Sequence, residues 1–288
     1  MSAQLNSGRS PRRSFARIRP GRLALEILVI LLCLAWLSPF YLLIVNTLKT
    51  MPEITASPLA LPAALRFDAY TRAWKQAHLG EYYKNSVIIS VVSVILSVSI
   101  SSLAAYAFAR LRFFGKQVLF FFILAGVMLP LQIALVPLYR LLSGMDLLST
   151  YQGMIALYVA FTIPFGIFIL TGFYRSIPVE IEEAAHIDGC SWFQSYWRIV
   201  MPLAAPGLVT MVILEFIWFW NEYLVALTMI QKEAVRTVML GVMVMANTFQ
   251  LDFSLLTAGI VIAVVPPILV YVFFQKYLIR GLTAGALK

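Results

Sequence analysis

The sequence predicts an all-α membrane protein with six transmembrane helices. Of its 288 residues, 61% are hydrophobic and only 12% are charged, whereas about 25% of the residues of a soluble domain carry a charge. Apolar runs of about 20 residues, which are long enough for a helix to cross ~30 Å of hydrocarbon, recur along the chain. We place the six spans at residues 23–48, 85–109, 117–138, 151–174, 206–230 and 256–277.

The distribution of basic residues predicts the topology. The net charge is +9, and six arginines lie in the first 22 residues, next to the first span. If that end is cytoplasmic, 14 of the 22 lysines and arginines fall in cytoplasmic segments, as the positive-inside rule requires. We therefore expect both termini in the cytoplasm. Because the arginines adjoin an apolar span, we expect a lipid bilayer around this chain and no nucleic acid as a partner.

The chain divides into four predicted parts. The first apolar run is much longer than the 7–15 residues typical of a signal peptide, so we expect a retained membrane anchor. The parts are a basic cytoplasmic tail at 1–21, the first span with an external segment at 22–84, a five-helix core at 85–278 with a polar cytoplasmic loop at 175–205, and a cytoplasmic tail at 279–288.

The third and the last span each contain two prolines. Pro130 and Pro137 lie in the third span, together with Gln132, which makes it the least regular of the six. Pro266 and Pro267 lie in the last span. Since proline removes a backbone hydrogen bond and kinks a helix, this pair predicts a bend, which serves either as a hinge or as a fixed shape.

The second span carries a row of serines. Ser86, Ser90, Ser93, Ser97 and Ser101 recur at steps of three or four residues, which keeps them on one helical face. Small polar residues let membrane helices approach closely and share hydrogen bonds. The row indicates either close helix packing or one wall of a polar passage, and in the second interpretation Ser93 and Ser97 are candidate path residues.

The fifth span has the most polar chemistry. On a continuous helix Glu215, Trp218 and Glu222 would share a face, and Trp220 and Asn221 add polar groups beside them. Carboxylates inside a membrane usually face a wet cavity or a partner. Aromatic rings beside hydrogen-bonding groups suit a sugar. These five residues are candidate path residues, and the alternative is pairing with a neighbouring helix or placement of Glu222 at the interface.

The sequence shows no catalytic or cofactor site. The pair Gly115 and Lys116 lacks the upstream glycine of a phosphate-binding loop. His78 and His186 are isolated, which argues against a metal site. We therefore expect no enzymatic activity, no metal and no cofactor in this chain.

The polar stretch EEAAHIDGCSWFQSYWRIVMP, residues 182–202, predicts a helix–turn–helix knob in the cytosol. Pro178 suits the first turn of a helix, and the small residues that follow the glutamates allow close approach of another protein. Gly189 is expected to end this helix in the left-handed conformation, with little room for a Cβ. Ser191 is expected to cap a second helix that ends before Pro202.

This stretch resembles the EAA signature of bacterial ABC-importer permeases, E-A-A-x3-G-x9-I-x-L-P. Here Glu183, Ala184 and Ala185 are followed after three residues by Gly189, and after nine more by Ile199, Val200, Met201 and Pro202. Methionine at the leucine position is the one departure. The stretches YYKNSVIIS and FIWFWNEYLVAL and the ending GLTAGALK are similar to the carbohydrate-uptake branch, specifically to the second permease of maltose-type importers.

The resemblance implies a type I ABC-importer permease fold and a multi-pass location in a bacterial inner membrane. It implies four partners: a second, homologous permease in a heterodimer, a dimer of ATP-binding subunits that hold ATP and Mg²⁺, an external solute-binding protein, and an oligosaccharide or disaccharide as the substrate. In the prototype the other permease binds most of the sugar. The implied ATPase-coupling residues are Glu183, Ala184, Ala185, His186, Asp188, Gly189, Ile199 and Pro202, and the implied tail contacts are Gly281, Thr283, Gly285 and Lys288.

Two alternatives stay open. One is the same type of ABC permease for a non-sugar solute, such as glycerol phosphate or a polyol. The other is an ion-coupled secondary carrier that uses Glu215 and Glu222 as proton sites, although no inverted repeat is evident in the sequence. A membrane-embedded enzyme would need a constellation of catalytic groups, and none is evident.

Overall fold

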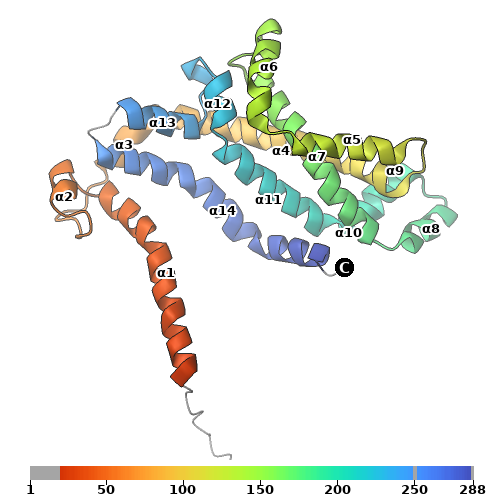
Figure 1. Ribbon diagram of the computed structural model, residues 1–288, viewed down its shortest axis with the longest axis horizontal. Coiled ribbons are helices and arrows are strands. Elements are labelled where there is room, and N and C mark those ends of the chain that lie inside the picture. The colour runs from red at the N-terminus through yellow and green to blue at the C-terminus, as the bar shows by residue number, and fades with distance from the viewer. Residues whose placement is uncertain (1–19, 249–251, 287–288) are drawn as a thin grey trace, which may run out of the picture.

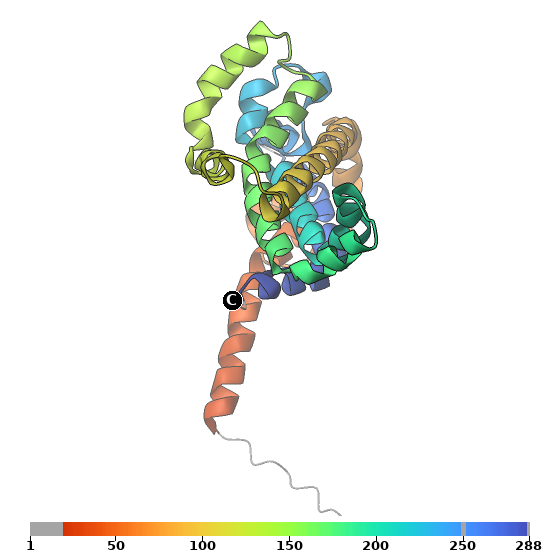
Figure 2. The ribbon, with the colours of Figure 1, turned by 90° about the vertical axis from the view of Figure 1, so that its right-hand side faces the viewer.

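The computed structural model describes residues 20–248 and 252–286, and over these ranges it contains helices and no strands. The long helices lie side by side in a bundle, and α1 (Pro20–Thr47) points away from it over most of its length in both views (Figure 1 and Figure 2). The predicted all-α class is therefore confirmed.

Four helices of the described residues are long and apolar enough to cross a membrane. Two bent helix pairs, residues 116–128 with 131–144 and residues 192–203 with 205–221, raise the number to six if each pair is one span. These four coincide with the predicted first, second, fourth and sixth spans. They are α1, α4 (Leu79–Arg110), α7 (Tyr151–Ser176) and α14 (Phe253–Ala286).

The third predicted span is broken. Helix α5 (Lys116–Met128) and helix α6 (Leu131–Gly144) meet at an angle of 97°, so a single helix over 117–138 is wrong. The break falls at Leu129 and Pro130, both of which have extended backbone. Proline disfavours helical geometry in the residue before it, and this explains the position of the break.

The fifth predicted span ends early. Helix α11 (Ala205–Asn221) stops before Glu222, whose backbone is extended, and a separate helix α12 (Leu224–Met229) follows. A continuous helix to residue 230 is therefore wrong. The Glu222 carboxylate accepts the N–H groups of Val225 at 2.7 Å and Ala226 at 3.0 Å, which satisfies the first free donors of α12 and favours a new start there.

The bundle core is built on α4, which packs against α7 and α11, while α11 packs against α14. The serine row of α4 is buried. A Cβ on Gly166 of α7 would lie 2.5 Å from the Ser101 hydroxyl, so the two helices are in close contact here. Ser86 accepts the Val238 N–H at 2.8 Å. These contacts fit the helix-packing interpretation of the row.

Short elements gather at the two opposite ends of the bundle (Figure 1). One end carries the first helical turns of α4 and α14. The other carries the end of α4 at Arg110 and the polar loop that follows α7. The first group comprises α2 (Met51–Ala56), α3 (Asp68–Lys75), η2 (Glu233–Val235) and α13 (Val238–Thr248), and the second comprises α8 (Val179–Ile187), α9 (Trp192–Ser195), η1 (Tyr196–Val200) and α10 (Met201–Leu203).

The C-terminal segment continues the last helix. The backbone of α14 stays helical through Gly281, Thr283 and Gly285 as far as Ala286. Lys288, which was assigned to the same tail, lies outside the described residues, as do residues 1–19 of the predicted basic tail.

Candidate functional site

The loop after α7 forms a helix–turn–helix, which we call the knob (residues 178–203). The turn is closed by backbone hydrogen bonds from Gly189 to His186, 3.0 Å, and from Cys190 to Ala185, 2.9 Å. Gly189 has φ +87°, which confirms the predicted left-handed conformation. A Cβ at this position would meet no described atom within 4 Å, so the expected lack of room is wrong, and a substitution there meets only backbone strain.

The second half of the knob begins with a capping box. The Ser191 hydroxyl accepts the Gln194 N–H at 3.3 Å, and the Gln194 side chain accepts the Ser191 N–H at 2.8 Å, as predicted for a helix start. The helix then continues through the π-helical turn η1 and α10 as far as Leu203. The expected stop before Pro202 is wrong, and the chain instead bends by 75° between Leu203 and Ala205.

Glu182 anchors the knob to the bundle. Its side chain is 1% exposed and forms an ion pair with Arg110 at the end of α4. It also accepts hydrogen bonds from the Tyr106 hydroxyl at 2.9 Å and the Ser195 hydroxyl at 3.3 Å. Glu182 was not among the candidate residues that the sequence indicated. Tyr106 and Arg110 could have indicated a buried acidic partner, because these two polar residues are four positions apart and share one face at the end of a span.

A second buried cluster ties the knob to two long helices. The Ser102 hydroxyl of α4 lies 2.5 Å from the Tyr174 hydroxyl of α7 and 2.6 Å from the Tyr196 hydroxyl of η1. All three side chains are buried. The Glu182 ion pair joins the knob to α4, and this cluster joins the knob to both α4 and α7. The knob, α4 and α7 therefore form one packed unit at this end of the bundle.

The outer surface of the knob is partly apolar. Ile187 is 87% exposed at the tip, and Trp192 is half-exposed. His186 has a structural role in the turn, because its Nδ1–H donates to the Cys190 carbonyl at 2.7 Å and its ring lies 4.1 Å from that of Trp192. Of the residues assigned to coupling, Ala185, His186 and Ile199 are half-buried, and Glu183, Ala184, Asp188, Gly189 and Pro202 are exposed.

The candidate path residues separate into two groups. Glu215, with Trp218, lines a cavity of about 380 Å³, and Ser97 donates a hydrogen bond to Glu215. Ser93 is buried but does not line the cavity.

The other three path candidates of the fifth span also lie away from this cavity. Trp220 is buried against α14, where its indole N–H donates to the Ala263 carbonyl at 2.8 Å. Asn221 is exposed and bonds the Ile217 carbonyl of its own helix. Glu222 caps α12 and does not share a face with Glu215, because α11 ends between them.

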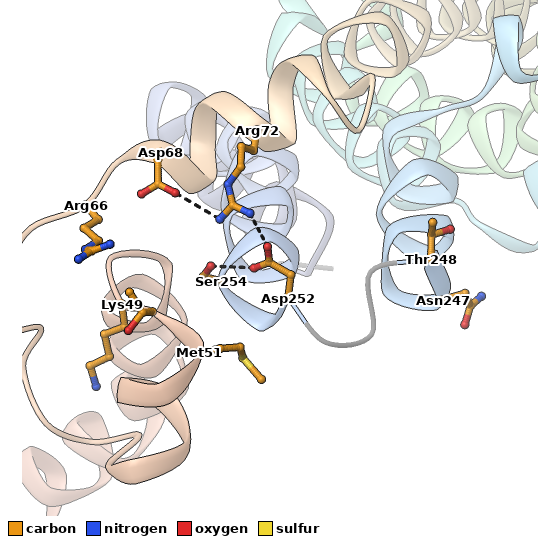
Figure 3. A pocket seen from close by; sticks show the side chains of 10 residues that line it. Lys49, Met51, Arg66, Asp68, Arg72, Asn247, Thr248, Asp252 and Ser254 are labelled. Atoms are coloured by element: carbon orange, nitrogen blue, oxygen red, sulfur yellow. Dashed lines mark hydrogen bonds and ion pairs between the residues drawn. The ribbon is translucent and has the colours of Figure 1, made fainter.

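The end of the bundle opposite the knob holds a second cavity, of about 640 Å³ (Figure 3). Arg72 of α3 forms ion pairs there with Asp252, just before α14, and with Asp68 at 3.3 Å. Burial raises the pKa of Asp252, but hydrogen bonds from the Leu255 N–H, Arg72 and Ser254 outweigh it, so the pKa lies below its ordinary value. The pair fastens α3 to the start of α14.

This lowered pKa predicts a pH dependence. A carboxyl group whose pKa is lower in the folded state stabilises the protein above its unfolded value of about 3.9 and loses this contribution as the pH falls through the lowered pKa. Asp252→Asn should therefore destabilise the protein at pH 6 by less than about 1 kcal/mol, since the pair is partly exposed. The difference from wild type should shrink below about pH 4. Thermal unfolding in detergent measures the stability difference between Asp252→Asn and wild type. An equal difference at pH 6 and below pH 4 would show that the pKa of Asp252 is not lowered in the folded protein.

Comparison with known proteins identifies the family. Residues 69–284 match the family described as "Binding-protein-dependent transport system inner membrane component". The chain is 34% identical over 278 residues to a diacetylchitobiose uptake system permease protein of Streptomyces coelicolor, covering 96% of this chain and 90% of the relative. It is 35% identical over 271 residues to a trehalose/maltose transport system permease protein of Thermococcus litoralis, covering 93% and 97%.

A solved structure has the same fold. It is the crystal structure of a bacterial ABC transporter involved in the import of the acidic polysaccharide alginate, and its matching chain has a TM-score of 0.77 at 24% identity, covering 88% of this chain and 95% of that chain. The family match spans most of the chain and includes the knob and the apolar helices that follow α1. The chain belongs to the multi-pass inner-membrane components of binding-protein-dependent transport systems.

Proposed function

We propose that this chain is the permease subunit of an ATP-binding-cassette importer that carries a disaccharide or oligosaccharide across the inner membrane. Relatives that are 34% and 35% identical are named for the transport of diacetylchitobiose and of trehalose and maltose. As a transport subunit the chain is not an enzyme, and ATP and Mg²⁺ bind to a separate ATPase subunit.

The knob is the observation that carries the coupling part of the proposal. A buried ion pair and a buried hydroxyl cluster hold it to α4 and α7, while its tip exposes Ile187 almost completely. An exposed apolar tip on a rigidly held element is suited to docking on another protein. In this proposal Glu183, Ala184 and Asp188 lie on the surface that meets the ATPase subunit, whose closure would then reorient α4 and α7.

Other parts of the molecule suit the remaining partners. Helices α1 and α6 project from the bundle (Figure 1 and Figure 2), which leaves apolar faces for a companion permease in a heterodimer and for lipid. The opposite end, with the cavity beside Arg72 and Asp252, supplies charged groups for an external solute-binding protein. The C-terminal end of α14 is the proposed contact with the ATPase dimer.

We further propose six crossings with both termini in the cytoplasm. The bent pair α5–α6 is one crossing, and α11 with α12 is another. Cysteines introduced singly at Ile187 and Ala60, after replacement of Cys33 and Cys190, should be labelled from opposite sides of the membrane. Ala60 should react with an impermeant maleimide in intact cells, and Ile187 only in inverted vesicles. Labelling of Ile187 from outside would refute both the topology and the docking of the knob.

The geometry disfavours an ion-coupled carrier that uses Glu222. Both of its carboxylate oxygens accept hydrogen bonds, from the N–H groups of α12 and from the Tyr158 hydroxyl at 3.0 Å. A group that holds a helix start in this way is poorly placed to exchange protons during transport, since protonation would remove an acceptor.

Uptake by the reconstituted complex tests the function. The chain is placed in lipid vesicles with a companion permease and an ATP-binding subunit of the same importer, with ATP inside and the solute-binding protein outside. Labelled maltose, trehalose and diacetylchitobiose are offered, with glycerol phosphate and sorbitol as non-sugar controls. We expect uptake of a sugar that requires both ATP and the binding protein. Uptake driven by a proton gradient without ATP, or uptake of a control solute alone, would overturn the proposal.

A further inference from the structure

The cavity beside Glu215 is partly open, and the exposed side chain of Leu129 stands at its edge. It is formed by residues of α5, α6, α7 and α11 and has a volume of about 380 Å³, within the range of about 300–1,000 Å³ usual for small-molecule sites. Its walls are mostly aromatic and aliphatic, with Phe161, Phe165 and Trp218 among them. Glu215 and Thr162 are its polar residues.

Glu215 is only partly satisfied by its neighbours. Its Oε1 accepts a hydrogen bond from the Ser97 hydroxyl at 2.9 Å, and the Ser97 hydroxyl in turn lies 2.7 Å from that of Thr162. The residue is 2% exposed. Its Oε2 has no hydrogen-bond partner among the residues that the structure describes, although a buried polar atom without a partner is costly.

The other two buried carboxylates of the described chain provide a comparison. Glu182 uses one oxygen for Arg110 and the other for Tyr106 and Ser195. Glu222 uses both oxygens for α12 and one also for Tyr158. A carboxylate that serves only to hold helices together is thus fully bonded in this fold. Glu215 departs from that pattern, and it lines the cavity between α5, α6, α7 and α11.

The cavity offers both aromatic ring surface and a hydrogen-bond acceptor. Trp218, which is 38% exposed, and Phe165, which is 37% exposed, offer ring surface. The Trp218 ring is held edge-on against Tyr158, with centroids 5.7 Å apart. A neutral sugar has apolar C–H faces that pack on rings and hydroxyl groups that donate to a carboxylate. A purely apolar ligand would leave the free oxygen of Glu215 unpaired.

We infer that this chain itself holds one sugar subsite, in which Glu215 accepts a hydrogen bond from a sugar hydroxyl and the rings of Trp218 and Phe165 pack against the sugar. Ser97 is a positioning residue, since its hydroxyl holds Glu215 Oε1. This inference rests on the proposed sugar-import function and deepens it: the companion permease is not the sole source of substrate contacts.

Binding to the purified complex tests the subsite. The complex of both permeases and the ATPase subunit is prepared without the solute-binding protein, and equilibrium dialysis measures the affinity for labelled maltose and diacetylchitobiose. Glu215→Gln preserves the side-chain shape, and with its amide oxygen held by Ser97 it places an NH2 donor where the free acceptor oxygen was. We expect sugar to bind roughly 3-fold to 10-fold more weakly than to wild type, as for loss of one hydrogen bond.

Two further variants make the result specific. Thr171→Val changes another buried hydroxyl of α7 that does not line the cavity, and it should bind sugar like wild type. Trp218→Leu keeps apolar volume but removes the ring, and it should weaken binding even if Glu215→Gln fails to assemble.

The outcomes separate this inference from the proposed function. Suppose that wild type imports a sugar. If Glu215→Gln and Trp218→Leu then bind that sugar with wild-type affinity, the subsite is refuted and the importer function stands. The same conclusion follows if wild type binds no sugar without the solute-binding protein. If wild type imports none of the three sugars, the proposed function fails first.

Discussion

Replacing Glu182 by alanine is expected to release the knob from the bundle. The change leaves Arg110, which is 7% exposed, as a buried charge without its partner carboxylate. Breaking a buried ion pair from one side typically costs about 3–5 kcal/mol. We expect a lower unfolding temperature in detergent and loss of the ATPase subunit on copurification, because α8 would no longer be held against the end of α4.

The neighbouring residue is the matched control. Glu183 is exposed, so Glu183→Ala should change stability by less than about 0.5 kcal/mol, as for other surface substitutions. The double variant Glu182→Ala with Arg110→Ala should recover part of the lost stability, since no buried charge is then left unpaired. Equal stability of the Glu182 and Glu183 variants would show that the ion pair does not hold the knob.

Replacing Gly166 by alanine is expected to separate α4 from α7. The added Cβ would lie 2.5 Å from the hydroxyl oxygen and 2.7 Å from the Cβ of Ser101, so one of the two helices must shift. Overpacking of this kind costs about 1–3 kcal/mol. Thermal unfolding in detergent should show the loss, and transport should fall because α4 and α7 connect the knob to the membrane core.

Gly172 of the same helix is the control for this change. A Cβ there meets no described atom within 4 Å, and alanine is favoured over glycine inside a helix by about 0.5–1 kcal/mol. Gly172→Ala should therefore be neutral or stabilising. If both alanine variants behave alike, close packing at Gly166 is not what joins the two helices.

The sequence predicts the regular parts of this molecule well because local signals agree there with the tertiary contacts. Helix α7 begins at Tyr151, as expected, and ends within two residues of the predicted bound. The turn at Gly189 and the cap at Ser191 follow from residue types with strong conformational preferences. Four apolar runs correspond to four long helices because hydrophobic length is sufficient to specify a span.

The parts that the sequence did not reveal depend on side chains that meet across the fold. Glu222 appeared to extend the face of Glu215, but it caps a new helix and meets Tyr158, a residue of another span. Glu182 stands in a run of acids that looks solvent-exposed, and only the packing of α8 against α4 places it beside Arg110. The bend at Pro130 was signalled by proline, but its angle depends on how α5 and α6 pack.

Photo-cross-linking from the tip of the knob shows whether the knob touches the ATP-binding subunit. Ile187→Cys, in a chain whose two native cysteines are replaced, is labelled with benzophenone and irradiated within the assembled importer, and Ala60→Cys serves as the probe at the opposite end. We expect a cross-link from residue 187 to the ATP-binding subunit and none to that subunit from residue 60. A complex that keeps its ATPase activity but shows no such product from residue 187, or shows it equally from residue 60, would contradict the assignment of the knob as the coupling element.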